Sequence, residues 1–342
     1  MTTPTGRGDA AHGSAAPTTA EPGDSARGEA ERGDAERGAA EPGHQARGDA
    51  QPGAPRVGPV AFVLGGGGRL GAAEVGMLDA LTTAGVVPDM VLGTSIGAIN
   101  GAVYASAPND DGLQRLRAVW SDFDRSGLLT TGIVDRLRTF VATRVSLHRS
   151  AELLALFDDA LPADVTFEDL AVDFQCVAAR VETAAAAWFS TGPVRPALLA
   201  SSAVPGLFEP VEIDGNHHYD GGLVSSIPLS RAIAAGAGTV YVLQVGRIEQ
   251  ALTAPSNPLQ VAQVSFEIAR RHGFATMMDS LPDGVDVHVL PSGGAAPAPE
   301  DLRGNLNYRD TSGLPETIER ARIASAAYLA DHGVASGTVT AS

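Results

Sequence analysis

Residues 90–97 read Met-Val-Leu-Gly-Thr-Ser-Ile-Gly, so a G-x-S-x-G motif follows directly on a short apolar run. A serine in this pattern occupies a sharp turn between a strand and a helix, with its hydroxyl exposed above the sheet. Gly97, Ala98 and Gly101 are small, which lets the next helix pack closely against the sheet. In a chain with 40 glycines the motif alone is close to a chance match, but this context makes Ser95 a candidate nucleophile.

A glycine loop lies upstream, after the apolar run Val60–Leu64, and its residues 65–71 read Gly-Gly-Gly-Gly-Arg-Leu-Gly. The G-x-G-x-x-G spacing within it fits a dinucleotide-binding loop, which also requires an acidic residue at the end of the second strand. Asp89 stands instead at the start of that strand. Dinucleotide binding is therefore kept as the weaker alternative.

The same loop offers backbone N–H groups to an oxyanion. Gly66, Gly67 and Gly68 have no side chain in the way, and the positive end of the following helix lies behind them. Parallel strands present their carboxyl ends at one edge of a sheet, where we expect the loop to meet Ser95. We expect these three glycines, together with the N–H of Ile96, to form an oxyanion hole.

The serine also needs a base, which a conventional triad supplies as a histidine. The eight histidines fit that role badly, because they fall in the N-terminal segment, in predicted helices and strands, or in a polar hairpin. The hairpin pair, His217 and His218, is expected to be exposed. Asp220 is followed by two glycines that allow the Ser95 turn to approach. Asp220 is therefore a candidate base, although Asp-Gly turns are also common on protein surfaces.

Strands and helices alternate in the first half of the folded chain, which predicts βαβ units and a parallel sheet. There the predicted strands are 60–64 and 90–92, and the predicted helices are 72–84 and 96–107. Downstream we predict strands at 172–180, 184–190, 239–245 and 285–290, a hairpin at 211–219, and helices at 196–203, 258–280 and 314–331. Residues 112–160 have the pattern of short amphipathic helices. The expected fold class is α/β.

Composition limits the partners and the compartment. The chain of 342 residues is 44% hydrophobic and carries a net charge of −16, which argues against nucleic acid and against avid docking on anionic lipid. The single cysteine, Cys176, excludes an intrachain disulfide. The chain lacks an apolar run of about 18 residues and a signal-peptide pattern, so we expect a cytoplasmic protein.

The N-terminal segment, residues 1–56, has a different character. Glycine recurs every five residues from Gly23 to Gly53, and apart from alanine there is almost nothing apolar to bury. A period of five matches neither a helix nor a strand. We predict a disordered low-complexity tail here and folded sequence from residue 57 onward.

Four stretches together resemble the patatin-like phospholipases, over about residues 58–245 and more weakly to about 330. They are the first strand and glycine loop (60–68), the serine turn (93–98), residues 202–208, and Asp220-Gly221-Gly222. The resemblance implies a three-layer α/β/α fold with a mostly parallel central sheet, in which Ser95 is the nucleophile and Asp220 the base of a Ser–Asp dyad. The expected domains are a catalytic domain at 57–332 with a helical insert at 112–170 and a terminal helix at 311–332, then a flexible C-terminus at 333–342.

One position departs from the family's G-G-G-x-R/K-G pattern, because alignment on Gly71 and Gly76 puts Leu70 at the basic position and Arg69 at the variable one. The resemblance implies hydrolysis of carboxylic esters of lipids, as a phospholipase A, lysophospholipase or esterase, without metal or cofactor. The expected partner is a lipid or acyl-ester substrate, with transient membrane contact left open and no nucleic acid. The departure keeps a second hypothesis open, a non-catalytic lipid- or acyl-binding protein on the same fold.

Overall fold

The computed structural model describes residues 58–126, 160–205, 207–245, 252, 254–256, 258–294 and 313–334. The tail predicted at 1–56 lies outside these residues, as do positions 127–159 of the predicted helical insert and the C-terminus beyond 334. Every described residue belongs to one compact unit, Gly48–Ser342. Across the described segments, no helix combines the length and the apolar character that a membrane span requires.

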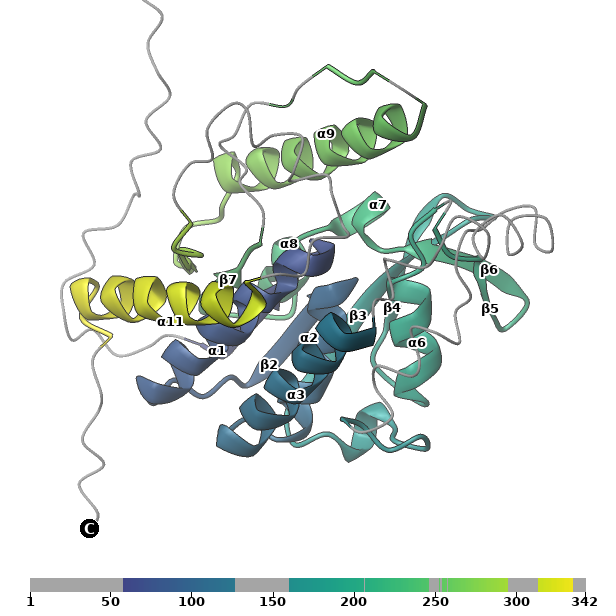
Figure 1. Ribbon diagram of the computed structural model, residues 1–342. Helices are drawn as coiled ribbons and strands as arrows, with labels where there is room; N and C mark the ends of the chain where they lie inside the picture. Colours follow the sequence, from purple (N-terminus) through teal and green to yellow (C-terminus); the bar gives the residue numbers. More distant parts are fainter. Residues whose placement is uncertain are drawn as a thin grey trace, which may run out of the picture. The chain divides into compact units, whose positions relative to one another are not determined.

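Within the described chain, eight strands form one mixed sheet with the order β5-β6-β3-β2-β1-β7-β8, and β4 pairs with β3 (Figure 1). The strands are β1 Val60–Leu64, β2 Met90–Thr94, β3 Asp173–Arg180, β4 Ala185–Phe189, β5 Val211–Ile213, β6 Asn216–Asp220, β7 Thr239–Leu243 and β8 Asp286–Val289. All five residues of β1 are buried, as expected of a strand between two parallel neighbours. The predicted strands and the predicted hairpin are confirmed.

The strands β3, β2, β1, β7 and β8 run parallel, so their carboxyl ends lie at one edge of the sheet. At the end of β1, Leu64 is in register with Gly93 of β2 and Leu243 of β7. The glycine loop leaves the sheet directly after Leu64, and Ser95 follows directly after β2. The two features therefore meet at the edge where open α/β sheets bind their ligands.

Helices cover both faces of the sheet, which makes three layers. They are α1 Ala72–Thr83, α2 Ile96–Ser106, α3 Asp110–Ser126, α6 Val194–Ser201, α7 Gly222–Ser225, α8 Leu229–Ala234, α9 Pro258–Asp279 and α11 Leu314–Asp331, with short 3-10 helices η1 Gly68–Gly71 and η2 Phe167–Asp169. Side chains alternate along β1. Phe62 and Leu64 join the core formed with α1, α2, α3, α6 and α11, whereas Ala61 and Val63 join the core formed with α8 and α9. The predicted α/β/α class is confirmed.

Two local expectations were wrong. Residues 160–166, expected within a helical insert, contain no helix. His218, expected to be exposed, is only 2% exposed. The reason is that β6 pairs with β3 on one side and β5 on the other, and the His218 ring packs edge-on against Phe189.

Candidate active site

Ser95 occupies a strained turn between β2 and α2. Its φ of 56° and ψ of −124° lie outside the ordinary regions for a residue with a side chain. Such a conformation costs roughly 1–3 kcal/mol and persists only where the surroundings enforce it. Here the Ser95 N–H donates to Ser201 Oγ at 3.0 Å, and Thr94 Oγ1 donates to the Ser225 carbonyl at 2.8 Å. The helix that follows approaches the sheet so closely that a Cβ on Gly97 would lie 2.5 Å from the Leu64 carbonyl oxygen.

Asp220 reaches Ser95 because two strands meet end to end along β3. Pairing of β2 with β3 ends at Thr94 opposite Val177, and pairing of β6 begins at Asp220 opposite Ala178. Since β4 occupies the other side of β3, β2 and β6 share one side and run toward each other. The residue after β2 and the last residue of β6 are therefore neighbours, although 125 positions separate them.

The Ser95 hydroxyl donates a hydrogen bond of 2.5 Å to Asp220 Oδ2. The other carboxylate oxygen, Oδ1, accepts the N–H of Gly222 at 2.7 Å. Backbone hydrogen bonds hold Asp220 in place. Its own N–H donates to the Ala203 carbonyl at 2.9 Å, and the N–H of Gly221 donates to the Ser201 carbonyl at 3.1 Å. Both carboxylate oxygens are thus fixed, and one of them faces the serine.

Burial decides the acidity of Asp220, which is 1% exposed. Loss of solvation raises the pKa of its carboxyl to about 6, although the hydrogen bonds from Ser95 and Gly222 act in the opposite direction. A carboxylate with this pKa is a stronger base than an ordinary aspartate and is still largely ionised at neutral pH. The environment therefore gives the carboxylate basicity suited to accepting the serine proton.

The glycine loop lies beside the serine. A Cβ built on Gly66 would be 3.4 Å from Ser95 Cβ. The N–H of Gly66 already donates to the Ser226 carbonyl at 2.9 Å, so in this conformation it does not face an oxyanion. Within the described residues, the N–H groups of Gly67, Gly68 and Ile96 have no backbone acceptor. Of the four predicted donors, Gly66 is thus the one that the described loops engage, and the other three are candidates for the oxyanion hole.

A buried polar cluster beneath the loop was missed by sequence reasoning. Asn100 Nδ2 donates to the Gly71 carbonyl at 3.0 Å and to Glu74 Oε2 at 2.7 Å, while Trp120 Nε1 donates to Asn100 Oδ1 at 3.0 Å. Burial raises the pKa of the Glu74 carboxyl well above its ordinary value, although the hydrogen bond from Asn100 acts in the opposite direction. The available signal was Glu74 itself, an acidic residue that interrupts the otherwise non-polar run of residues 72–78. The cluster ties η1 and α1, which carry the loop, to α2, which follows Ser95.

Two further sequence hypotheses concern residues at the margin of the site. Asp89 Oδ2 accepts the N–H of Val60 at 2.7 Å, at the amino end of β1 and far along the strand from the glycine loop. The acid that a dinucleotide site requires is therefore at the wrong edge of the sheet. Leu70, at the family's basic position, packs against the larger core.

A family model described as patatin-like phospholipase matches residues 62–233, a range that includes the glycine loop, Ser95 and Asp220. Similar curated proteins include a patatin-like phospholipase domain-containing protein of Caenorhabditis elegans, 32% identical over 193 residues, and lysophospholipase nte1 of Aspergillus terreus, 29% identical over 190 residues. An uncharacterised NTE family protein of Mycobacterium bovis is 28% identical over 204 residues.

These similarities cover part of each protein. The match to the C. elegans protein spans 56% of this chain and 14% of that protein, and the match to the A. terreus protein spans 56% and 12%. The match to the M. bovis protein spans 60% of this chain and 54% of that protein. The chain therefore matches only part of the length of each of these relatives.

Proposed function

Since this chain belongs to the patatin-like phospholipase family, we propose that it hydrolyses carboxylic esters of lipids through Ser95 and Asp220, as a phospholipase A, lysophospholipase or esterase. The observation that carries the proposal is the 2.5 Å hydrogen bond from the Ser95 hydroxyl to a buried carboxylate. A serine is a weak nucleophile unless an adjacent base takes its proton. Asp220 is the group positioned to take it.

In the first half of the reaction, Asp220 accepts the hydroxyl proton while Ser95 Oγ attacks the ester carbonyl carbon. The carbonyl oxygen becomes an oxyanion, which the N–H groups of Gly67, Gly68 and Ile96 stabilise. Loss of one such donor typically costs about 10²–10³ in rate. Collapse of the tetrahedral intermediate breaks the ester bond, and the leaving alcohol takes the proton from Asp220.

In the second half, a water molecule gives a proton to Asp220 and attacks the acyl-serine. The second tetrahedral intermediate releases the carboxylic acid and returns the proton to Ser95. The same carboxylate thus acts as base and then as acid in each half, which suits a group whose pKa is about 6.

The test is hydrolysis of short p-nitrophenyl esters and of phospholipids by the full chain and its variants. We expect Ser95→Ala and Asp220→Asn to lower kcat by about 10³-fold or more. Matched controls are Ser106→Ala, near the end of α2, and Asp214→Asn, on the turn between β5 and β6; both should retain wild-type rates. Undiminished hydrolysis by either dyad variant would refute the assignment.

A fluorophosphonate probe separates this proposal from a non-catalytic binding protein. Wild type should be labelled stoichiometrically at Ser95, and Ser95→Ala should not react. A chain that binds fatty acyl ligands but neither hydrolyses esters nor reacts with the probe would be the binding protein instead.

A further inference from the structure

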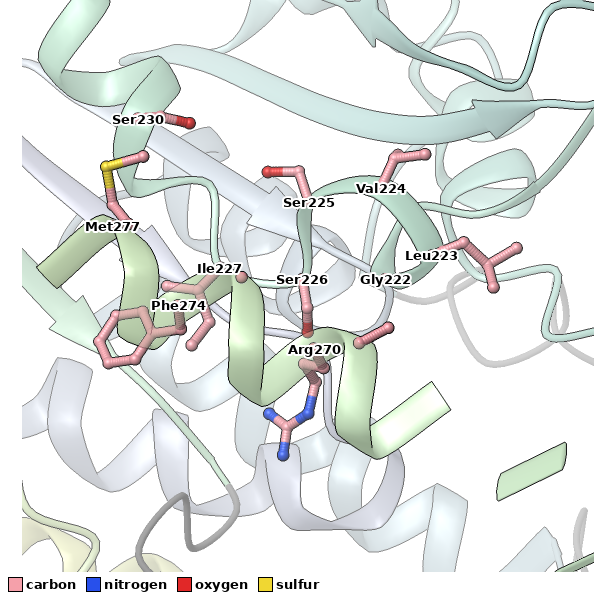
Figure 2. A pocket seen from close by; sticks show the side chains of 12 residues that line it. Gly222, Leu223, Val224, Ser225, Ser226, Ile227, Ser230, Arg270, Phe274 and Met277 are labelled. Atoms are coloured by element: carbon pink, nitrogen blue, oxygen red, sulfur yellow. The ribbon is translucent and has the colours of Figure 1, made fainter. Parts of the chain in front are cut away.

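A cavity of about 190 Å³ lies between α7 and α9, directly after the aspartate turn. Figure 2 shows that its walls combine apolar side chains such as Phe274 and Met277 with two buried polar ones, Ser226 and Arg270. Arg270 is only 5% exposed. A buried guanidinium requires a reason, because taking a charge out of water is costly unless its hydrogen bonds are met.

The Arg270 side chain connects α9 to the loops at the carboxyl edge of the sheet. Its Nη1 lies 3.3 Å from the Gly66 carbonyl oxygen and 3.3 Å from the Val245 carbonyl oxygen. Its Nη2 donates to Glu267 Oε2 at 2.9 Å. The cation therefore joins the loop after β1 to the segment after β7, and one of its two carbonyl contacts is the glycine loop itself.

The hydrogen bond from Arg270 to the Gly66 carbonyl also determines the direction of the neighbouring Gly67 N–H. The Gly66 carbonyl and the Gly67 N–H belong to one planar trans peptide, so they point in opposite directions. A hydrogen bond that holds this carbonyl toward Arg270 consequently fixes the direction of the Gly67 N–H. A charged donor on the carbonyl also polarises the peptide, which makes its N–H a stronger donor.

We propose that Arg270 is a positioning residue for ester hydrolysis, which fixes and polarises the Gly66–Gly67 peptide so that the Gly67 N–H binds the oxyanion. The inference rests on the proposed function, because it concerns the same reaction. The loop needs external support, since glycines impose little conformational preference of their own. On the other side of Gly67, a Cβ would lie 2.4 Å from Val245 Cγ2, so the Val245 segment that Arg270 holds also packs on this peptide.

The central experiment compares kcat and KM of wild type, Arg270→Ala, Arg270→Met and Arg270→Lys on one p-nitrophenyl ester. Arg270→Met keeps the apolar stem and so protects the packing. We expect kcat to fall by about 10–100-fold in the Ala and Met variants with KM changed by less than about threefold, because the effect acts through one oxyanion donor. Arg270→Lys should recover part of the loss.

Chemical rescue distinguishes positioning from a merely structural role. Arg270→Ala enlarges the existing cavity, which then has room for a free guanidinium ion. Low-millimolar guanidinium should raise kcat of Arg270→Ala saturably, whereas urea, a neutral molecule of similar shape, should not. Neither additive should raise kcat of wild type.

Arg271→Gln is the matched control, since Arg271 is the next residue of α9 and its Nε donates to the same Glu267 carboxylate at 3.2 Å. This variant should keep kcat within about twofold of wild type. A kcat of Arg270→Met within about twofold of wild type would overturn the inference, as would a loss that Lys and guanidinium both leave unchanged. Wild type that neither hydrolyses esters nor reacts with fluorophosphonate would instead defeat the proposed function itself.

Discussion

Asp220 has no cationic partner among the contacts that the structure describes. Its carboxylate accepts one hydroxyl and one backbone N–H in a site that excludes solvent. This is how a buried aspartate obtains a higher pKa, because a nearby arginine or lysine would lower it again. This environment suits Asp220 to the proton exchange with Ser95 that we propose, rather than to an ion pair.

The first prediction at the residue scale concerns the pH dependence of hydrolysis. Asp220 must be ionised to accept the serine proton, and its pKa is about 6. We expect kcat/KM for a neutral ester to rise about tenfold per pH unit below this pKa and to level above it. Rates measured from pH 4.5 to 8.5 check this, and a profile that is flat from pH 5 to 7 would contradict it.

The second prediction concerns stability. Because the pKa of Asp220 is raised on folding, the folded chain holds this proton more tightly than the unfolded chain, and stability falls as pH rises from about 4 to 6. Asp220→Asn removes the buried charge and should stabilise the fold at pH 7.5 by about 1–3 kcal/mol.

Denaturant unfolding at pH 7.5 and pH 4 checks that second prediction. The difference between Asp220→Asn and wild type should shrink toward zero at pH 4, where the wild-type carboxyl is protonated in the folded state and no longer carries a buried charge. If Asp220→Asn were less stable than wild type at pH 7.5, the ionised carboxylate would stabilise the fold. That result would contradict the prediction, because the change in the free energy of unfolding would have the opposite sign.

At the scale of elements, Ser95 and Asp220, the proposed dyad, lie side by side because β2 and β6 end against each other along β3. The turn after β6 passes so close to β3 that a Cβ on Gly221 would lie 2.1 Å from the Val177 carbonyl oxygen. The glycine after Asp220 is therefore required by the approach of two backbones. Its position sets how far the aspartate can reach toward Ser95.

Substitution of that glycine is the prediction at this scale. Gly221→Ala should displace Asp220 from Ser95, lower kcat by at least about 100-fold, and destabilise the fold by about 2–4 kcal/mol. The matched control is Gly273→Ala in α9, where an added Cβ meets nothing within 4 Å. The control should be neutral or stabilising by up to about 1 kcal/mol. Activity assays and urea unfolding of both variants check the contrast; equal effects in the two would contradict it.

At the scale of the whole molecule, the two faces of the sheet have different roles. The larger core, with α1, α2, α3, α6 and α11, carries the helices that follow the glycine loop and Ser95. The smaller core, with α8 and α9, carries Arg270 behind the loop. The site at the sheet edge is thus supported from both layers (Figure 1).

Net charge gives the prediction at this scale. With a charge of −16, the chain should be repelled by anionic lipid surfaces. We expect faster hydrolysis of lipid in zwitterionic micelles than in micelles containing phosphatidylglycerol, with the difference reduced at high salt because of screening. Initial rates at low and high ionic strength check this. Faster turnover of anionic micelles at low salt would contradict it.

Local sequence determined which segments form strands and helices and which residues form the turns between them. The apolar runs at 60–64 and 90–92 are strands, and the serine turn and glycine loop lie at one edge of the sheet as expected, because strand period, small residues and parallel pairing act over short distances. The α/β class follows from the same alternation, whereas the three-layer α/β/α arrangement was implied by the family resemblance.

Tertiary structure decided which groups the site contains and how acidic they are. The 2.5 Å contact of Ser95 with Asp220, the engaged N–H of Gly66, the buried Glu74 and the arginine from α9 all depend on packing between segments distant in sequence. Burial of His218 has the same origin. The physical reason is that desolvation and hydrogen bonding are properties of the packed environment, which a local pattern of residue types does not encode.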